Sequence, residues 1–368
     1  MIIILRPDVA ADSPEVSNIL VTAKRFPDLQ TKTITNKGEN HLLTEVHLIG
    51  ETKVVPLEAF AELPGVMKVV RVSEKYRLIG RHGQVDAVGF DYRGLRFGQD
   101  TLHVFPGLCA VDTRENVDRT FAATAKAGVK TARMGAYKPR TSPYDFQGHG
   151  KDCLPWVFEL AGKHGIQVVA MEILREKHVD EIFAALEQTG KPTGVMLQIG
   201  TRNAQNFELL KHVGQQKEFP VLFKRGMGIT LEEALNACEY IASEGNRSIV
   251  FCLRGVKSHL GEPHRNLIDF SHVPVVKRQT RLPVCVDPSH SAGRRTINPD
   301  GLTDIHHATA EGVILGANMV LVDFHPEPKN AMCDGPQALT LEELPAYLAD
   351  VKIVRDAYLA RQLKPATR

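Results

Sequence analysis

The chain has 368 residues, 43% hydrophobic and 24% charged, a composition typical of a soluble globular protein with room for more than one core. Its 45 basic and 43 acidic side chains leave a net charge of +2, so neither nucleic acid nor a membrane is expected as a partner. No run reaches the ~18 apolar residues of a membrane span, and six scattered cysteines without a Cys-x-x-Cys pair predict free thiols in a reducing cytoplasm.

The first 80 residues predict a small α+β domain. Ser13-Pro14 opens a helix that runs to Lys24, and Pro56 opens a second helix that ends at Leu63. The β-rich runs that alternate with these helices are Ile2–Leu5, Thr31–Thr35, Leu42–Ile49 and Val66–Val72. The order βαββαβ is the ferredoxin-like pattern. Such a unit serves either as an oligomer interface or as a small-molecule sensing module.

From about residue 100 the pattern changes to apolar, β-branched runs separated by helical stretches. The eight runs are His103–Leu108, Val129–Arg133, Gln167–Ala170, Gly194–Gln198, Val221–Lys224, Ser248–Leu253, Pro283–Asp287 and Met319–Asp323. Eight such units in about 250 residues favour an α/β fold of the (β/α)8 TIM-barrel type. A doubly wound sheet is the alternative, and the lack of a Gly-x-Gly-x-x-Gly after an early strand weakens it. The predicted division is a ferredoxin-like domain at 1–80, a linker at 81–98, the barrel at 99–352 and a tail at 353–368.

Basic side chains follow five of the predicted strands. Because the active sites of such barrels lie at the C-terminal ends of the strands, these side chains are expected to share one mouth. Arginine offers a planar fork that matches phosphate, and lysine offers a compact charge. Each could instead pair with a surface carboxylate, but as a set they predict a site for several anionic groups. The set comprises Arg133, Lys138, Arg140, Arg202, Lys224, Arg225 and Arg254.

A second group, after the first, seventh and eighth strands, could bind a metal ion. Thiolate, imidazole and carboxylate are ligands for divalent first-row ions. The spacing is not a local metal motif, and a lone cysteine or histidine is usually a buried structural residue. These strands become neighbours when the barrel closes, however, which favours a shared site. The group comprises Cys109, His290, Asp323 and Asp334.

Four motifs resemble those of the 3-deoxy-D-arabino-heptulosonate-7-phosphate (DAHP) synthases, type I beta subgroup, which are related to the octulosonate 8-phosphate synthases. The resemblance covers residues 100–350 densely, and the N-terminal unit resembles the regulatory domain of some members. The motifs are Lys138-Pro139-Arg140-Thr141-Ser142-Pro143, Arg202-Asn203-Ala204-Gln205-Asn206, Asp287-Pro288-Ser289-His290-Ser291 and His325-Pro326-Glu327-Pro328.

The resemblance implies a metal-dependent, aldol-type condensation of phosphoenolpyruvate with erythrose 4-phosphate, the first step of the shikimate pathway. It implies a divalent ion (Mn, Fe, Co or Zn) at the four positions named above, an aromatic amino acid as effector, and a homo-oligomer, either dimer or tetramer, in the cytoplasm. Lys138, Cys109 and His290 correspond to catalytic positions. The substrate-binding positions correspond to Arg133, Lys138, Arg140, Thr141, Glu172, Arg202, Lys224, Arg254 and Asp287.

The chain departs from the family pattern close to the predicted site. Leu108 and Ala110 flank Cys109 where the family reads Gly-Pro-Cys-Ser, and Met134 follows Arg133 where it reads Arg-Gly-Gly. Met134 is expected to add bulk beside the anion site. Leu253 stands where the family usually has Glu, and Asp323 replaces the metal-binding Glu. These changes keep two other hypotheses open: a related synthase using another phosphorylated aldose, and a non-catalytic paralogue that binds phosphorylated ligands.

Overall fold

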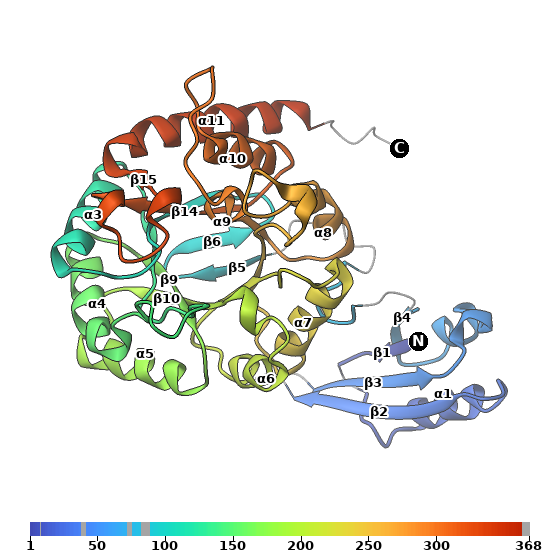
Figure 1. Ribbon diagram of the computed structural model, residues 1–368. Helices are drawn as coiled ribbons and strands as arrows, with labels where there is room; N and C mark the ends of the chain where they lie inside the picture. Colours follow the sequence, from blue (N-terminus) through green and yellow to red (C-terminus); the bar gives the residue numbers. More distant parts are fainter. Residues whose placement is uncertain (8, 38–41, 72–75, 82–88, 363–368) are drawn as a thin grey trace. The chain divides into compact units, whose positions relative to one another are not determined.

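The computed structural model describes residues 1–7, 9–37, 42–71, 76–81 and 89–362 and divides the chain into two compact units, Met1–Gln84 and Val85–Arg368 (Figure 1). Each unit has its own hydrophobic core. This agrees with the change in the sequence pattern between the first 80 residues and the region from about residue 100. Among the described residues, no helix is both long and apolar enough to cross a bilayer.

The first unit is a four-stranded antiparallel sheet with two helices. Its strands lie in the order β2-β3-β1-β4, so that β1 pairs with both β3 and β4. This order and the βαββαβ chain path confirm the ferredoxin-like prediction. Of the predicted strand Val66–Val72, Val66–Val70 forms β4, and Val72 lies outside the described residues. The elements are β1 (Ile2–Leu5), α1 (Pro14–Ala23), β2 (Gln30–Lys37), β3 (Leu42–Ile49), α2 (Glu58–Ala61) and β4 (Val66–Val70).

The second unit is a closed eight-stranded parallel barrel, which confirms the predicted TIM-barrel fold. Each strand pairs with the next in chain order, and β14 closes the ring by pairing with both β13 and β7. These strands are buried almost throughout, as expected where helices cover the outer face. They are β7 (His103–Leu108), β8 (Thr131–Met134), β9 (Val168–Ile173), β10 (Gly194–Ile199), β11 (Val221–Lys224), β12 (Ile249–Leu253), β13 (Val284–Val286) and β14 (Met319–His325).

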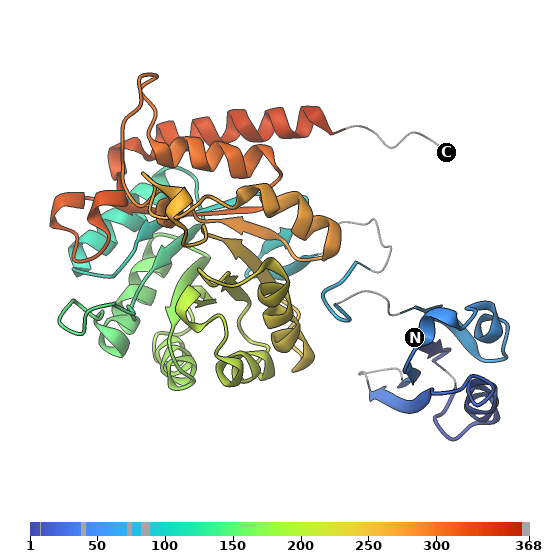
Figure 2. The same cartoon turned by 45° about the vertical axis from the view of Figure 1, so that its right-hand side comes forward.

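Helices surround this barrel in the view of Figure 1, and α10 lies beside α11 in both Figures 1 and 2. Side-chain caps begin several of them: Thr230 and Glu233 form a capping box at α7, and Thr113 caps α3. The helices are α3 (Arg114–Lys126), α4 (Leu154–Lys163), α5 (Lys177–Gln188), α6 (Phe207–Gln215), α7 (Leu231–Ser243), α8 (Val273–Gln279), α9 (Pro288–Ala292), α10 (Asp304–Ile314) and α11 (Leu344–Arg361).

A hairpin of β5 (Gly89–Tyr92) and β6 (Leu95–Gly98) lies within the segment predicted as a linker. Its two turn residues have positive φ, which is the geometry of a type I′ turn. Phe97 shares a core cluster with barrel-strand residues that include Val168 and Met319, the first residues of β9 and β14, so the hairpin closes the N-terminal end of the barrel. Because the hairpin covers the N-terminal end, the C-terminal end of the barrel is the open one. The predicted tail at 353–368 also differs, because α11 continues through Arg361.

Candidate active site

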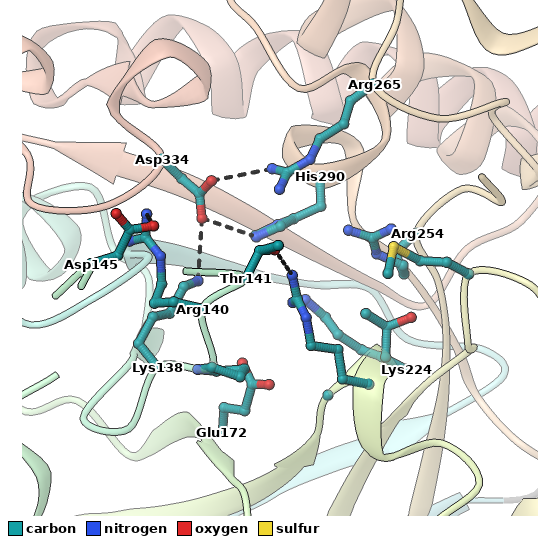
Figure 3. A pocket seen from close by; sticks show the side chains of 15 residues that line it. Lys138, Arg140, Thr141, Asp145, Glu172, Lys224, Arg254, Arg265, His290 and Asp334 are labelled. Carbon is teal, nitrogen blue, oxygen red and sulfur yellow. Dashed lines mark hydrogen bonds and ion pairs between the residues drawn. The ribbon is translucent and has the colours of Figure 1, made fainter. Parts of the chain in front are cut away.

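A pocket opens at the C-terminal end of the barrel, where the sequence predicted the reactive residues to meet. Nine of the predicted site residues line it, and they come from the ends of strands β8 to β14 and the segments that follow them (Figure 3). Cys109, Arg133, Asp287 and Asp323 lie beneath them and are all 5% exposed or less. The pocket-lining set is Lys138, Arg140, Thr141, Glu172, Arg202, Lys224, Arg254, His290 and Asp334, together with Pro139, Asp145, Gly200, Thr201, Met227 and Arg265.

Local backbone geometry sets the position of several of these groups. Lys224 is the last residue of β11, and Glu172 lies near the end of β9. Gly200 follows β10 at a point where a Cβ would lie 1.8 Å from a carboxylate oxygen of Glu172, so glycine gives that carboxylate its room. Asp287 caps the short helix α9 by accepting a hydrogen bond from the backbone N–H of His290 at 3.0 Å.

A thiol, an imidazole and a carboxylate meet on one side of the pocket. Cys109 Sγ lies 3.0 Å from Asp334 Oδ2 and 3.5 Å from His290 Nε2, and that nitrogen lies 3.7 Å from the same Asp334 oxygen. Lys138 Nζ lies 2.7 Å from Cys109 Sγ and 3.2 Å from Asp334 Oδ2. Figure 3 shows Asp334 contacting Lys138, His290 and Arg265 together. Donors of these three chemical types at such separations fit a transition-metal ion.

Charge interactions in this group outweigh the cost of burial. Burial opposes ionisation of Cys109, but hydrogen bonding with Cys333 and the charge of Lys138 hold the pKa of the Cys109 thiol well below its usual value. Burial would likewise raise the pKa of Asp334, but contact with His290 and the charge of Lys138 have the larger effect and lower it overall. Burial would lower the pKa of Lys138, but the charges of Cys109 and its neighbours raise it. The group therefore places two readily ionised acidic side chains beside a protonated lysine.

Asp287 fixes the orientation of the His290 ring. Its carboxylate lies 3.0 Å from His290 Nδ1 and accepts a hydrogen bond from Lys224 Nζ at 2.5 Å. A proton held on Nδ1 leaves the lone pair of Nε2 toward Cys109 and Asp334. Burial lowers the pKa of His290, but the Asp287 carboxylate raises it by more.

Asp323 lies near the C-terminal end of β14 and is 1% exposed. Arg133 Nη1 donates to its Oδ1, and Gln337 Nε2 donates to its Oδ2 at 2.5 Å. Its Oδ2 also lies 3.8 Å from His290 Nδ1. The donor atoms of Asp323, Cys109 and His290 lie within 4.8 Å of one another.

Two arginines at the pocket have buried nitrogen atoms without hydrogen-bond partners in the described part of the chain. They are Arg140 Nη1 and Arg254 Nη1. Arg202 Nη2 donates to Thr141 Oγ1 at 3.2 Å, which brings the residues after β8 and β10 together. Buried donors with unused hydrogen-bonding capacity, lying in a basic pocket, suit an anionic ligand.

Several sequence expectations need correction or addition. Arg225 does not line the pocket, because its Nη1 donates to Asp269 Oδ2 at 3.0 Å and the side chain is held below the surface. Met134 is fully buried and is absent from the described lining of the pocket, so it does not crowd the anion site. Sequence reasoning missed Arg265, which lies in the long segment after β12. It also missed Cys333, whose only signal is that it precedes Asp334.

Comparison with known proteins gives a consistent result. A model of the DAHP synthetase I family matches residues 79–359. Phospho-2-dehydro-3-deoxyheptonate aldolase of Thermotoga maritima is 34% identical, over 97% of this chain and 98% of that protein. Its crystal structure superposes with a TM-score of 0.70 and covers 97% of both chains. A 2-dehydro-3-deoxyphosphooctonate aldolase of Actinobacillus pleuropneumoniae is 31% identical, over 69% of this chain and 89% of that protein.

Proposed function

The chain belongs to the DAHP synthetase I family, and we propose that it condenses phosphoenolpyruvate with erythrose 4-phosphate. The products are 3-deoxy-D-arabino-heptulosonate 7-phosphate and inorganic phosphate. The observation that carries this proposal is a pocket in which lysines and arginines from several strand ends surround a thiol, an imidazole and a carboxylate. Such a pocket can hold two phosphorylated substrates beside a metal ion bound by the thiol, the imidazole and the carboxylate.

The basic side chains bind and orient both substrates. Lys138, Arg202, Lys224 and Arg254 line the pocket and hold the phosphate and carboxylate groups of phosphoenolpyruvate, with Arg133 beneath them. Arg140 and Thr141, on the loop after β8, hold the phosphate of the aldose. Fixing the two anions so that C3 of phosphoenolpyruvate faces the aldehyde carbon removes much of the entropic cost of a reaction between two molecules.

The reaction forms one carbon–carbon bond and releases one phosphate. C3 of phosphoenolpyruvate attacks the aldehyde carbon, the aldehyde oxygen gains a proton, and water adds at C2. Cleavage of the C2–O bond then expels phosphate and leaves the ketone. Lys138 is protonated beside Cys109 and Asp334, so it can donate a hydrogen bond to the developing alkoxide.

Cys109, His290 and Asp334 would hold the divalent metal ion, because their donor atoms lie 3.0 to 3.7 Å apart. When bound, such an ion polarises the aldehyde oxygen. Asp287 keeps the His290 ring in place through Nδ1. Glu172, which lines the pocket and accepts a hydrogen bond from Gln198, would orient the water. We expect the ion to be divalent Mn, Fe, Co or Zn.

Phosphate release from phosphoenolpyruvate tests the proposed reaction. Release should require both erythrose 4-phosphate and a divalent metal ion, and Cys109→Ala should lose most of it. A five-carbon aldose phosphate, which would give an eight-carbon product, is the matched comparison, since some relatives are octonate aldolases. Preference for the five-carbon sugar would support the alternative synthase. A protein that binds phosphoenolpyruvate but releases no phosphate with any aldose would be the non-catalytic paralogue.

A regulatory role is proposed for the first unit. Its ferredoxin-like fold has its own core and forms a unit separate from the one that carries the pocket. An aromatic amino acid that binds this unit can change turnover only if it binds one state of the protein better than another.

A further inference from the structure

A second pocket lies beside the candidate active site, at the same end of the barrel. It is a cavity of about 1000 Å³ between the segment that follows β12 and the C-terminal end of α9. Its lining contains the basic side chains of Lys257, Arg265 and Arg294 and one carboxylate, that of Glu262. The lining therefore carries a positive charge even when its histidines are neutral.

Backbone contacts hold the two walls of the second pocket together. The N–H of Arg265 donates to the carbonyl of Ala292 at 2.9 Å, and the N–H of Asn266 donates to the carbonyl of Ser291 at 3.1 Å. Gly293 ends α9 with a φ of 78°, and a Cβ on it would lie 2.2 Å from the Cβ of Arg265. Glycine thus allows the walls to approach, and the second pocket is formed before any ligand binds, as is usual for small-molecule sites.

Arg265 lines both pockets with one guanidinium group. Its Nη1 donates to Asp334 Oδ1 and to Gln337 Oε1, each at 3.1 Å (Figure 3). Its Nε and Nη2 make no hydrogen bond with the residues that the structure describes, and the side chain is 43% exposed. The N–H groups of these two nitrogens form the fork that matches two oxygens of a phosphate group.

Two further cations in the second pocket lack a counter-ion. Within the described part of the chain, the side chains of Lys257 and Arg294 make neither a hydrogen bond nor an ion pair. His264 differs, because its Nε2 lies 3.5 Å from Asp304 Oδ2. Like charges that line one pocket repel each other, and a bound anion removes that repulsion.

We propose that the second pocket binds a small phosphate-containing molecule, held by Lys257, Arg265 and Arg294. Arginine supplies a planar fork for the phosphate oxygens, and lysine supplies a compact charge. A volume of about 1000 Å³ is in the range of pockets that hold whole organic ligands, so a phosphate ester is favoured over the free ion. The reaction proposed above does not require this site, and binding can be measured without turnover.

Calorimetric titration of the full-length protein with glycerol 3-phosphate tests the proposal, since this ester has no aldehyde and cannot react. Low ionic strength is needed because salt screens exposed charges. Lys257→Ala/Arg294→Ala should bind one equivalent fewer than the parent, and each single substitution should weaken that equivalent about tenfold, as expected for loss of one charge-assisted hydrogen bond. Without added ester, the double variant should release phosphate from phosphoenolpyruvate at the rate of the parent.

Lys126→Ala/Lys130→Ala is the matched control. Both lysines are exposed and precede β8, at the other end of the barrel, so the net charge changes equally while the second pocket stays intact. The control should bind the ester like the parent. Equal loss of binding in the two double variants would show nonspecific attraction, and unchanged binding in Lys257→Ala/Arg294→Ala would show that the second pocket takes no anion; either result overturns the proposal.

Arg140→Met separates the two pockets, because it removes a phosphate contact from the candidate active site alone. This variant should keep the equivalent that depends on Lys257 and Arg294. Loss of that same equivalent in Arg140→Met would place all of the binding in the active site and overturn the proposal. Inorganic phosphate distinguishes the two sources of the ligand: tighter binding of the ester to the second pocket supports an organic phosphate, and equal binding supports the free ion.

Discussion

Replacement of Arg254 tests whether the barrel mouth is built to receive anions. Its guanidinium follows β12, is 3% exposed, and has a buried Nη1 without a hydrogen-bond partner in the described structure. Burial lowers its pKa, which indicates that the charge is incompletely compensated. The Asp287 carboxylate attracts it but is already contacted by Lys224 at 2.5 Å and by His290 at 3.0 Å.

Arg225 is the matched control, since it follows the neighbouring strand β11 and is equally buried. It donates to Asp269 Oδ2 at 3.0 Å and to the Ile229 carbonyl. Arg225→Met leaves the Asp269 carboxylate buried and unpaired, so it should lower the free energy of unfolding by about 3–5 kcal/mol. Arg254→Met removes an uncompensated charge and should leave the free energy of unfolding unchanged or raise it by up to about 3 kcal/mol.

Arg254→Met should weaken ligand binding even though it does not lower stability. A charge-assisted hydrogen bond contributes about 1.5–3 kcal/mol, so Arg254→Met should weaken phosphoenolpyruvate binding roughly tenfold to 100-fold. Urea unfolding gives the stabilities, and isothermal titration calorimetry gives the affinities. If Arg254→Met is destabilised as much as Arg225→Met and binds phosphoenolpyruvate like the parent, then Arg254 has a structural partner and no role in anion binding.

Three further changes test other parts of the molecule. Gly200→Ala should displace the Glu172 carboxylate and lower turnover more than it lowers the urea midpoint, and an unchanged turnover would contradict the role of that glycine. Burial raises the pKa of Asp112, but its 2.7 Å contact with His325 lowers it overall. The contribution of Asp112 to stability is therefore complete above the carboxyl pKa of the unfolded chain, about 4, and disappears as the pH falls through the lower pKa of the folded protein. The urea midpoints of the parent and Asp112→Asn should therefore converge below about pH 4; midpoints that diverge there would contradict this role. Removal of residues 1–84 should leave a barrel that releases phosphate but no longer responds to aromatic amino acids; an intact protein already insensitive to all three would contradict the sensing role.

The barrel could be predicted because its strands carry a strong and repeated signal. A strand buried on both faces needs apolar residues throughout, and β7 and β11 begin and end where the apolar runs do. The hairpin β5–β6 could not be predicted, because its four-residue strands mix glycine, charged and aromatic residues. Its burial comes from packing under the barrel, a contact that local patterns do not encode.

Strand ends are the part of the site that the strand pattern alone could predict. Closure of the barrel brings such residues together whatever their neighbours are, which is why Lys224 and Arg254 both line the pocket. Arg225 also directly follows a strand, and only its tertiary contact with Asp269 takes it out of the pocket. Arg265 reaches the pocket from within a long connecting segment, where neither strand ends nor periodicity mark a position.

Metal binding and anion binding should be coupled through Asp334. Its Oδ2 lies 3.2 Å from Lys138 Nζ, and its Oδ1 accepts a hydrogen bond from Arg265 at 3.1 Å. A divalent cation at this carboxylate neutralises the charge that attracts both side chains and leaves them available to a substrate anion. Phosphoenolpyruvate should therefore bind about 5- to 150-fold more tightly to the zinc-loaded protein than to the metal-free protein, the range of typical coupling energies. Calorimetric titrations with and without zinc measure this ratio, and linkage requires zinc affinity to rise by the same factor when phosphoenolpyruvate is present. In Arg265→Met the ratio should shrink, because one of the two released cations is gone. Equal affinities in the two forms would show that Lys138 and Arg265 stay paired with Asp334 and take no part in holding the substrate.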